Sequence, residues 1–187
     1  MSINNYKKKY NTKSIRLRSW DYSTSWWYFI TIATKKHENY FGQIRNGKVH
    51  LNEIGKIVKN EWLMTKELRE NIDLDEFIIM PNHFHGILFI LEHDEIRRDV
   101  ARNVSTNNSY FSQISPKSNS LSSIIRAFKS AVTRRVHKNC YDYFKWQDRF
   151  YDWIIRNENE LYNIRKYIVQ NPMKWELDNE IPENMRV

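Results

Sequence analysis

Cysteine is nearly absent from this chain of 187 residues, which contains only Cys140. A single thiol excludes an intramolecular disulfide framework and a zinc site built on cysteine ligands, and it fits a reducing compartment. The chain also has no apolar run long enough to span a bilayer, and its polar N-terminus lacks the apolar region of a signal peptide. We therefore expect a cytoplasmic protein with no membrane partner.

Acidic residues are fewer than basic ones, with 22 Asp and Glu against 30 Lys and Arg, which gives a formal net charge of +8 at pH 7. Such an excess indicates a polyanionic partner, because Lys and Arg release condensed counterions from phosphates. Aromatic residues make up 14% of the chain, including seven Trp, and offer surfaces on which unpaired bases can stack. Nucleic acid is the leading candidate partner. The alternative is a solvated basic surface around an aromatic core.

The length predicts one compact domain with a substantial core. We place this domain at residues 21–175, after a basic N-terminal arm, residues 1–20, and before a C-terminal tail, residues 176–187. The arm is either disordered or lies along a partner. Residues 92–119 are polar and without a sustained period, which predicts a long mobile loop of a kind that often serves function.

Hydrophobic periodicity and turn residues predict a mixture of strands and helices without internal repeats. Asn46-Gly47 is a strong hairpin signal, Asn157 with Glu160 indicates the start of the last helix, and Pro172 indicates its end. The predicted elements are a strand at 27–34, a hairpin of 41–44 and 48–51, a helix from 53 to about 69–71, strands at 74–80 and 83–91, a helix at 120–138, an extended segment within 144–155, and a helix from 157. The order lacks the regular alternation of a doubly wound sheet. We therefore expect an α+β fold, with an antiparallel sheet that carries its helices on one face.

Two histidines stand one residue apart in the apolar segment Met80-Pro-Asn-His-Phe-His-Gly. Residues i and i+2 of a strand share a face, so His83 and His85 project side by side and can serve as paired ligands of one divalent metal. A buried pair without metal would need partners for four ring nitrogens. The alternative is a pair of ordinary core or surface histidines, since a single short motif often occurs by chance.

A phenol and an amide stand four residues apart near the end of the last predicted helix, at Tyr167 and Asn171. This spacing puts both groups on one face, at the border of the apolar stripe, where they can be directed at the sheet. The alternatives are a core tyrosine with its hydroxyl in water and an asparagine that caps the helix. Chemistry alone does not select one of eleven tyrosines, and the other open choices are Tyr141, Tyr143, Tyr151 and Tyr162.

Several motifs occur together and in one order along the chain. They are Met80-Pro-Asn-His-Phe-His-Gly-Ile, Ile124-Ile-Arg-Ala-Phe-Lys-Ser, Trp146-Gln with Tyr151, Ile154-Ile-Arg-Asn-Glu, and Tyr167-Ile-x-x-Asn-Pro-x-x-Trp. In these motifs the chain resembles the REP-associated tyrosine transposases, which belong to the IS200-like family of single-tyrosine HUH endonucleases. The resemblance runs from about Leu17 to Trp175 and leaves the segment 92–117 without a counterpart.

The resemblance implies an HUH-type, ferredoxin-like domain and a role for each site residue. His83 and His85 would be the paired metal ligands, Tyr167 the nucleophile, and Asn171 the third protein ligand, where IS200 enzymes proper carry Gln. The activity implied is cleavage and rejoining of single-stranded DNA beside a REP-like hairpin, with Mg²⁺ or Mn²⁺ and a 5′-phosphotyrosine intermediate. Dimeric IS200 relatives complete each site with the partner's tyrosine helix. We favour a monomer here, as the family resembled can work as one.

A DNA partner also suits the distribution of charge. Bases beside the hairpin could stack on aromatic residues such as Trp20, Tyr22 or Trp26, although each of these can equally be a packed aromatic. The residues expected to hold phosphates are Arg126, Lys129, Arg134 and Arg135 of one helix and Arg16 and Arg18 of the arm. For any one of them the alternative is a solvated surface charge.

Two other functions are compatible with the same residues. One is a domesticated protein that binds hairpin DNA without turnover, which would be favoured if Tyr167 lay far from the histidines. The other is a two-histidine metal hydrolase that activates water, which predicts cleavage without a covalent adduct.

Overall fold

The computed structural model describes residue 17, residues 19–92 and residues 119–180 of the chain. The N-terminal arm with Arg16 and Arg18, residues 93–118 of the predicted loop, and residues 181–187 of the predicted tail lie outside the described residues. Within the described part, no helix combines the length and the apolar character that crossing a bilayer requires.

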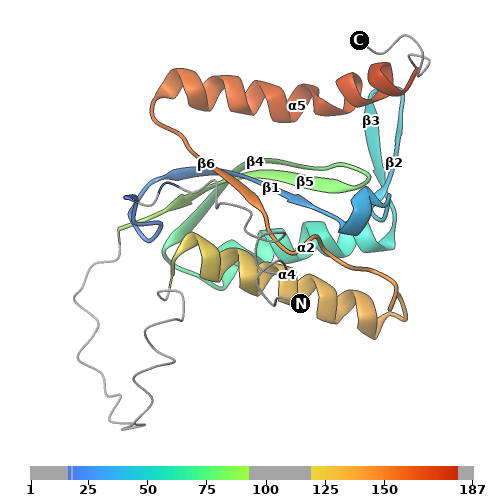
Figure 1. The fold of residues 1–187 in the computed structure, drawn as a ribbon, viewed down its shortest axis with the longest axis horizontal. Coiled ribbons are helices and arrows are strands. Elements are labelled where there is room, and N and C mark those ends of the chain that lie inside the picture. The colour runs from blue at the N-terminus through green and yellow to red at the C-terminus, as the bar shows by residue number, and fades with distance from the viewer. Residues whose placement is uncertain (1–16, 18, 93–118, 181–187) are drawn as a thin grey trace, which may run out of the picture.

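A four-stranded antiparallel sheet forms the middle layer of the molecule, with the strand order β4-β5-β1-β6 (Figure 1). Its strands are β1 (Trp27–Ala33), β4 (Ile72–Ile79), β5 (His83–Ile90) and β6 (Tyr151–Ile154). The register of the two central strands pairs Thr31 with His85 and Ala33 with His83. The predicted strands and the α+β class are confirmed, and the chain turns between β4 and β5 at Pro81-Asn82 as expected.

The predicted hairpin forms a separate two-stranded sheet of β2 (Gly42–Arg45) and β3 (Lys48–Leu51). Asn46 and Gly47 both adopt positive φ, 52° and 67°. A two-residue turn needs such angles to match the twist of its strands, and Asn and Gly accept them most readily. A short 3-10 helix, η1 (Lys35–His37), lies between β1 and β2.

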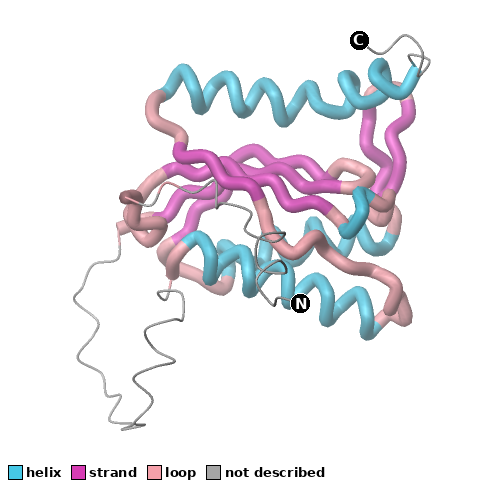
Figure 2. Tube along the Cα trace, viewed as in Figure 1, coloured by secondary structure: helices cyan, strands magenta, loops and turns pink. Residues whose placement is uncertain are grey.

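Helices cover both faces of the sheet, so the expectation of helices on one face is wrong (Figure 2). Helices α2 (Glu53–Glu67) and α4 (Leu121–Lys138) lie on one side, and α5 (Glu158–Glu180) lies on the other. The physical reason is the burial of alternate residues in β5. Phe84 and Leu88 on one side and His85 and Ile87 on the other are all buried, so both faces of the strand need cover.

Two apolar cores of unequal size follow from this three-layer arrangement. The larger lies between the sheet and helices α2 and α4, where Trp62 contacts the rings of Phe84 and Phe128. The smaller lies under α5 and consists of Phe29, Ile87, Ile155 and Ile168. Helix α5 therefore rests on a much smaller apolar area than the other two helices.

Pro172 lies inside α5, so the prediction that the helix ends there is wrong. Proline removes one backbone hydrogen bond and normally kinks or stops a helix. Contacts beyond the proline hold the chain in helical form. Trp175 packs on His83, and the carboxylate of Glu176 accepts hydrogen bonds from the backbone N–H groups of Asn46 and Gly47. Residues 176–180, expected in the tail, thus belong to the helix.

Candidate active site

The two histidines lie side by side on the face of β5 that α5 covers. Their ring centroids are 4.6 Å apart. His85 Nδ1 is 2.8 Å from the hydroxyl of Thr31, its partner in the register of β1, and His83 Nδ1 is 2.7 Å from the side-chain oxygen of Asn82. Both rings are therefore oriented by a hydrogen bond at Nδ1, which leaves Nε2 of each ring for other contacts.

Tyr167 of α5 directs its hydroxyl at this histidine pair. The phenol oxygen is 3.3 Å from His85 Nε2. Phe29 of β1 supports both groups, because it stacks on the His85 ring at 5.4 Å and meets the Tyr167 ring edge-on at 6.2 Å. Tyr167 is 40% exposed, so the residue is open to solvent on one side while its ring is held by packing on the other.

Asn171 lies on the helix between two contacts with the histidines. Tyr167 packs on His85, and Trp175 packs on His83 with ring centroids 5.6 Å apart. Residues four apart share a face of a helix, so Asn171 faces the sheet between these aromatic contacts, and it is buried at 8% exposure. No hydrogen bond of its side chain to another described residue is present, which leaves its amide oxygen available at this position.

Burial lowers the pKa of both imidazoles. The pKa of His83 falls from 6.5 to about 4, first because burial disfavours the charged form and second because of the charge of His37. The pKa of His85 falls to about 3, again through burial first and the charge of His83 second. Both rings are therefore neutral at pH 7, the form in which an imidazole nitrogen can bind a metal.

The donor set fits a divalent metal. A ligating imidazole commonly binds through one nitrogen while the other is fixed by a protein hydrogen bond, and Nδ1 of both rings has such a bond. Among the described residues, no three or more His, Cys, Asp and Glu side chains come together in a metal-binding group. A third protein ligand from this part of the chain would have to be of another type, and the amide oxygen of Asn171 is the candidate. Imidazole ligands suit Mn²⁺ better than Mg²⁺.

A relative of known sequence covers almost the entire chain. It is an uncharacterized protein of Haemophilus influenzae, 37% identical over 177 residues, an alignment that covers 91% of this chain and 96% of the relative. The chain belongs to the same family as this protein. No protein-family model matches the sequence.

The fold of this family has a counterpart among solved structures. A REP-associated tyrosine transposase bound to a REP hairpin superposes with a TM-score of 0.56 at 18% identity, over 87% of this chain and 74% of that chain. At this identity the likeness shows a shared fold, the α+β arrangement predicted from the sequence.

The other candidate tyrosines lie farther from the histidines. Tyr151 pairs with Thr31 in the register of β6 and β1, and Thr31 pairs with His85. It therefore lies on the same row of the sheet, but two strand spacings from His85, about 10 Å. Tyr162 is on α5, five residues before Tyr167, and is 65% exposed. The contact with His85 thus distinguishes Tyr167 from Tyr151 and Tyr162.

The basic residues of α4 are not brought to this site, because α4 and α5 lie on opposite faces of the sheet (Figure 1). Arg135 is paired at 2.5 Å with the buried carboxylate of Glu61. The ammonium group of Lys129 donates to the carbonyl oxygens of Gln147 and Asp148, and burial lowers its pKa. Both residues therefore have structural contacts. Arg126 and Arg134 are exposed and remain available to a partner.

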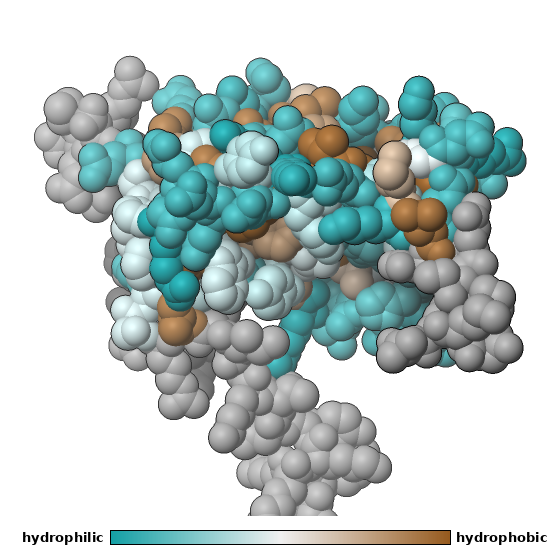
Figure 3. All heavy atoms as spheres, turned by 90° about the horizontal axis from the view of Figure 1, so that it is seen from above, coloured by the Kyte–Doolittle hydropathy of each residue, from teal (hydrophilic) through white to brown (hydrophobic). Residues whose placement is uncertain are grey.

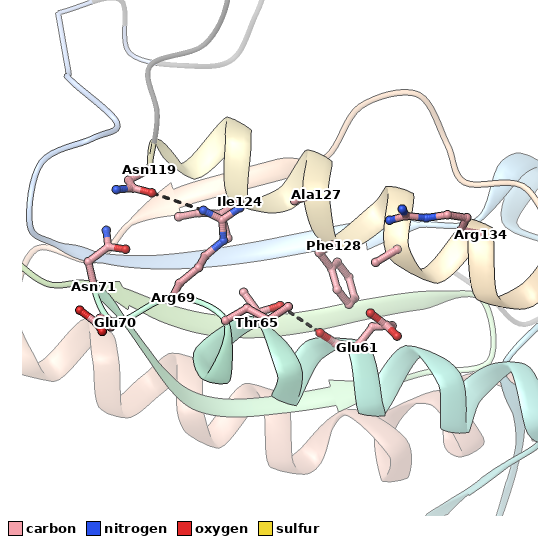
Figure 4. A pocket seen from close by; sticks show the side chains of 12 residues that line it. Glu61, Thr65, Arg69, Glu70, Asn71, Asn119, Ile124, Ala127, Phe128 and Arg134 are labelled. Carbon is pink, nitrogen blue, oxygen red and sulfur yellow. Dashed lines mark hydrogen bonds between the residues drawn. The ribbon is translucent and has the colours of Figure 1, made fainter. Parts of the chain in front are cut away.

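A cavity of about 520 Å³ lies between α2 and α4, also on the far side of the sheet from Tyr167. Figure 4 shows Arg69 and Asn119, which are hydrogen-bonded, at one end and Arg134 at the other. The buried carboxylate of Glu61, which is paired with Arg135, also lines the cavity. The cavity contains none of the residues of the histidine and tyrosine cluster.

Besides Asn82, which bonds His83 Nδ1, sequence reasoning missed three residues of the site. Thr31 orients His85, Phe29 supports His85 and Tyr167, and the ammonium of Lys174 lies 5.9 Å from the centre of the Tyr167 ring. The first two depend on the register between strands far apart in the chain, which the sequence does not display. Lys174 lies seven residues after Tyr167, on the same helical face, and this spacing was a usable signal.

Proposed function

We propose that this protein is a metal-dependent endonuclease and strand transferase that cleaves single-stranded DNA beside REP-like hairpins through a 5′-phosphotyrosine. The observation that carries the proposal is the 3.3 Å distance between the phenol oxygen of Tyr167 and His85 Nε2. It brings a phenol to a pair of neutral imidazoles whose Nδ1 atoms are each fixed by a hydrogen bond. The likeness in fold to a transposase bound to a REP hairpin and the net charge of +8 support DNA as the substrate.

His83, His85 and Asn171 would hold the metal. When bound, Mg²⁺ or Mn²⁺ would polarise a non-bridging oxygen of the scissile phosphate and orient the bond to be broken. The packing of Phe29 against both His85 and Tyr167 fixes the phenol relative to these ligands. Such prior orientation lowers the activation barrier, because less entropy is lost when the reacting groups reach the geometry of the transition state.

Tyr167 would attack phosphorus with its phenol oxygen. A bond forms between this oxygen and phosphorus, the bond from phosphorus to the 3′ oxygen breaks, and the released 3′ oxygen takes up a proton. A phenol has an ordinary pKa of about 10 and is a weak nucleophile at neutral pH. If Nε2 of His85 ligates the metal, it cannot also take the phenol proton. The proton then passes to solvent, which reaches the side chain at its 40% exposure. The reverse attack by a 3′ hydroxyl rejoins strands without a nucleotide cofactor.

The decisive experiment compares tyrosine variants in an adduct assay. Wild-type protein with Mn²⁺ and a single-stranded hairpin substrate should give a denaturant-stable protein–DNA adduct that maps to the peptide with Tyr167. Y167F should bind the same DNA but form neither adduct nor nick, because it lacks only the attacking oxygen. Y151F and Y162F are matched controls and should retain cleavage, and chelator should abolish it in all variants.

The same assay separates the two rival functions. A hairpin-binding protein without turnover would bind the substrate and leave it intact in every variant. A metal hydrolase that activates water would nick without an adduct, and its nicking would survive in Y167F. Either result would refute the phosphotyrosine mechanism, and an adduct that maps to Tyr151 or Tyr162 would refute the assignment of Tyr167 as the nucleophile.

A further inference from the structure

An aromatic pocket of about 730 Å³ opens beside the first turns of α5. We name it the aromatic pocket, and it is defined by Trp26, Trp27, Phe89, Tyr162, Arg156 and Arg165. Trp27 and Phe89 lie on the strand faces that also carry Phe29 and His85, because residues two and four apart in a strand share a face. The pocket is thus on the same side of the sheet as Tyr167 (Figure 3 shows this side of the molecule). Its volume is in the range of small-molecule sites.

The aromatic side chains of the pocket are unusually accessible. Tyr162 is 65% exposed and Trp26 is 37% exposed, whereas Trp62 in the large core is fully buried. The rings of Trp27 and Phe89 are 4.7 Å apart and inclined by 30°, so they stack on each other, and both line the pocket. Exposed aromatic faces around a pocket are suited to stacking with a flat, unsaturated ring, and every nucleobase has such a ring.

Two arginines place positive charge at the rim. The guanidinium of Arg156 lies 5.2 Å from the centre of the exposed Trp153 ring. Arg165 is fixed by hydrogen bonds from its Nε to both oxygens of Asp75, at 3.1 and 3.0 Å. Because Arg165 is paired with Asp75, Arg156 is the group that can contact a phosphate while a base is in the pocket. Glu158 is the acidic residue of the lining, and a carboxylate can accept from an exocyclic amino group of a base.

The pocket is continuous with the candidate active site along the sheet. His85 and Phe89 are four residues apart on one face of β5, about 13 Å along the strand. Phe29 contacts His85 and Tyr167 and is two residues from Trp27 on the same face of β1. A single strand with its scissile phosphate at Tyr167 would therefore reach the pocket within a few nucleotides.

We infer that the aromatic pocket binds an unpaired base of the substrate strand, a few nucleotides from the scissile phosphate. The inference rests on the proposed function, because single-stranded DNA must be the ligand. It assigns to Trp27, Phe89 and Tyr162 the stacking of the base and to Arg156 the contact with an adjacent phosphate. The pocket would thus position the DNA strand, whereas the phenol oxygen of Tyr167 would form the bond to phosphorus.

Photocrosslinking tests the inference directly. The substrates are DNA hairpins with unpaired arms on both sides. One set is made for each nucleobase of which the arms can consist. Within a set, each substrate carries a single 5-iododeoxyuridine, placed at a different unpaired position. Irradiation of the wild-type complex should crosslink one position to a peptide with Trp26, Trp27 or Tyr162. Crosslinks confined to α4, or to peptides outside the pocket, would overturn the inference.

An affinity measurement provides a second, independent test. Y162A should weaken binding of the intact hairpin about 5-fold or more, the loss of one base stack. It should have no effect when the crosslinking nucleotide is replaced by an abasic site. Y143A is the matched control, because Tyr143 is similarly exposed at 58% but does not line the pocket. Equal affinities of Y162A and wild type for the intact hairpin would refute the binding of a base in the aromatic pocket.

The two proposals fail in different ways. Both pocket measurements are made without metal and report binding alone, so they can succeed even if no adduct forms at Tyr167. Conversely, an adduct at Tyr167 without a crosslink in the pocket would leave the phosphotyrosine mechanism intact and dismiss the base site.

Discussion

The imidazole of His85 contacts three groups from two other elements, two of them on β1 and one on α5. The Thr31 hydroxyl meets Nδ1, the Tyr167 phenol meets Nε2, and the Phe29 ring stacks on its face. The alternation of a strand predicted that His83 and His85 share a face. It could not predict Thr31, because the pairing of β1 with β5 joins residues 54 positions apart. The local geometry of this site was therefore visible in the sequence, and its hydrogen-bond partners were not.

Acid should destabilise the metal-free protein through these two histidines. Their pKa values in the folded state, about 4 for His83 and about 3 for His85, lie below the ordinary 6.5, so the unfolded chain binds protons first. Their contribution to stability is complete above pH 6.5 and is lost as the pH falls toward the folded values. The loss is about 1.4 kcal/mol per histidine for each pH unit. Urea unfolding in chelator across this range measures it.

Matched variants assign the acid effect to the correct rings. H83Q/H85Q should remove most of the slope of unfolding free energy against pH between 6.5 and 4, since neither amide titrates. H50Q changes an exposed histidine on β3 and should keep the slope. An undiminished slope in H83Q/H85Q would show that other groups cause the acid sensitivity.

Helix α5 shows which end of a helix could be predicted from the sequence and which could not. Its start was predictable, because the Asn157 side chain accepts from the N–H of Glu160 at 2.9 Å, as the local motif indicated. Its end was not. Local rules stop a helix at Pro172, but the bonds of Glu176 to the turn of the β2–β3 hairpin extend it. The hairpin was predicted as a local unit, and its role as a support for α5 depends on a contact between residues 130 apart.

Removing this support should loosen the second half of α5. E176A leaves the N–H groups of Asn46 and Gly47 without their carboxylate partner, and hydrogen bonds to a charged group contribute about 1–3 kcal/mol. We expect a loss in this range in urea unfolding and faster hydrogen exchange at these two amides. E158A, on the exposed first turn of the same helix, is the control and should change neither amide. Normal protection of both amides in E176A would contradict the role given to Glu176.

At the scale of the molecule, the sheet separates the candidate active site from the basic helix α4 (Figure 1). The sequence identified both groups of residues but could not place them on opposite faces, because it did not reveal that the strands are buried on both sides. Two of the four expected phosphate contacts on α4 are engaged in the fold, Arg135 with Glu61 and Lys129 with backbone carbonyls. This leaves Arg126 and Arg134 as the charges of α4 on which DNA binding can depend.

Neutralising these two charges tests whether the DNA reaches the far face. R126Q/R134Q should weaken hairpin binding and reduce the slope of log affinity against log salt by about one unit per lost phosphate contact. The rate of cleavage at saturating DNA should stay unchanged, since α4 does not contact Tyr167. K56Q/K59Q removes two exposed charges from α2 and serves as a charge-matched control. An unchanged slope in R126Q/R134Q would mean that α4 carries only solvated surface charge.

Because α5 is the last described element, it is also the last of the described elements to be synthesised on the ribosome. The large core between the sheet and helices α2 and α4 contains most of the buried apolar residues, and nearly all of them precede α5 in the chain. Tyr167 follows His85 by 82 residues. A chain still emerging from the ribosome therefore presents the histidine pair long before it presents the phenol. Under the proposed mechanism, an unfinished copy would lack the tyrosine that attaches to the DNA, so synthesis itself would delay the reactive chemistry until α5 has been made.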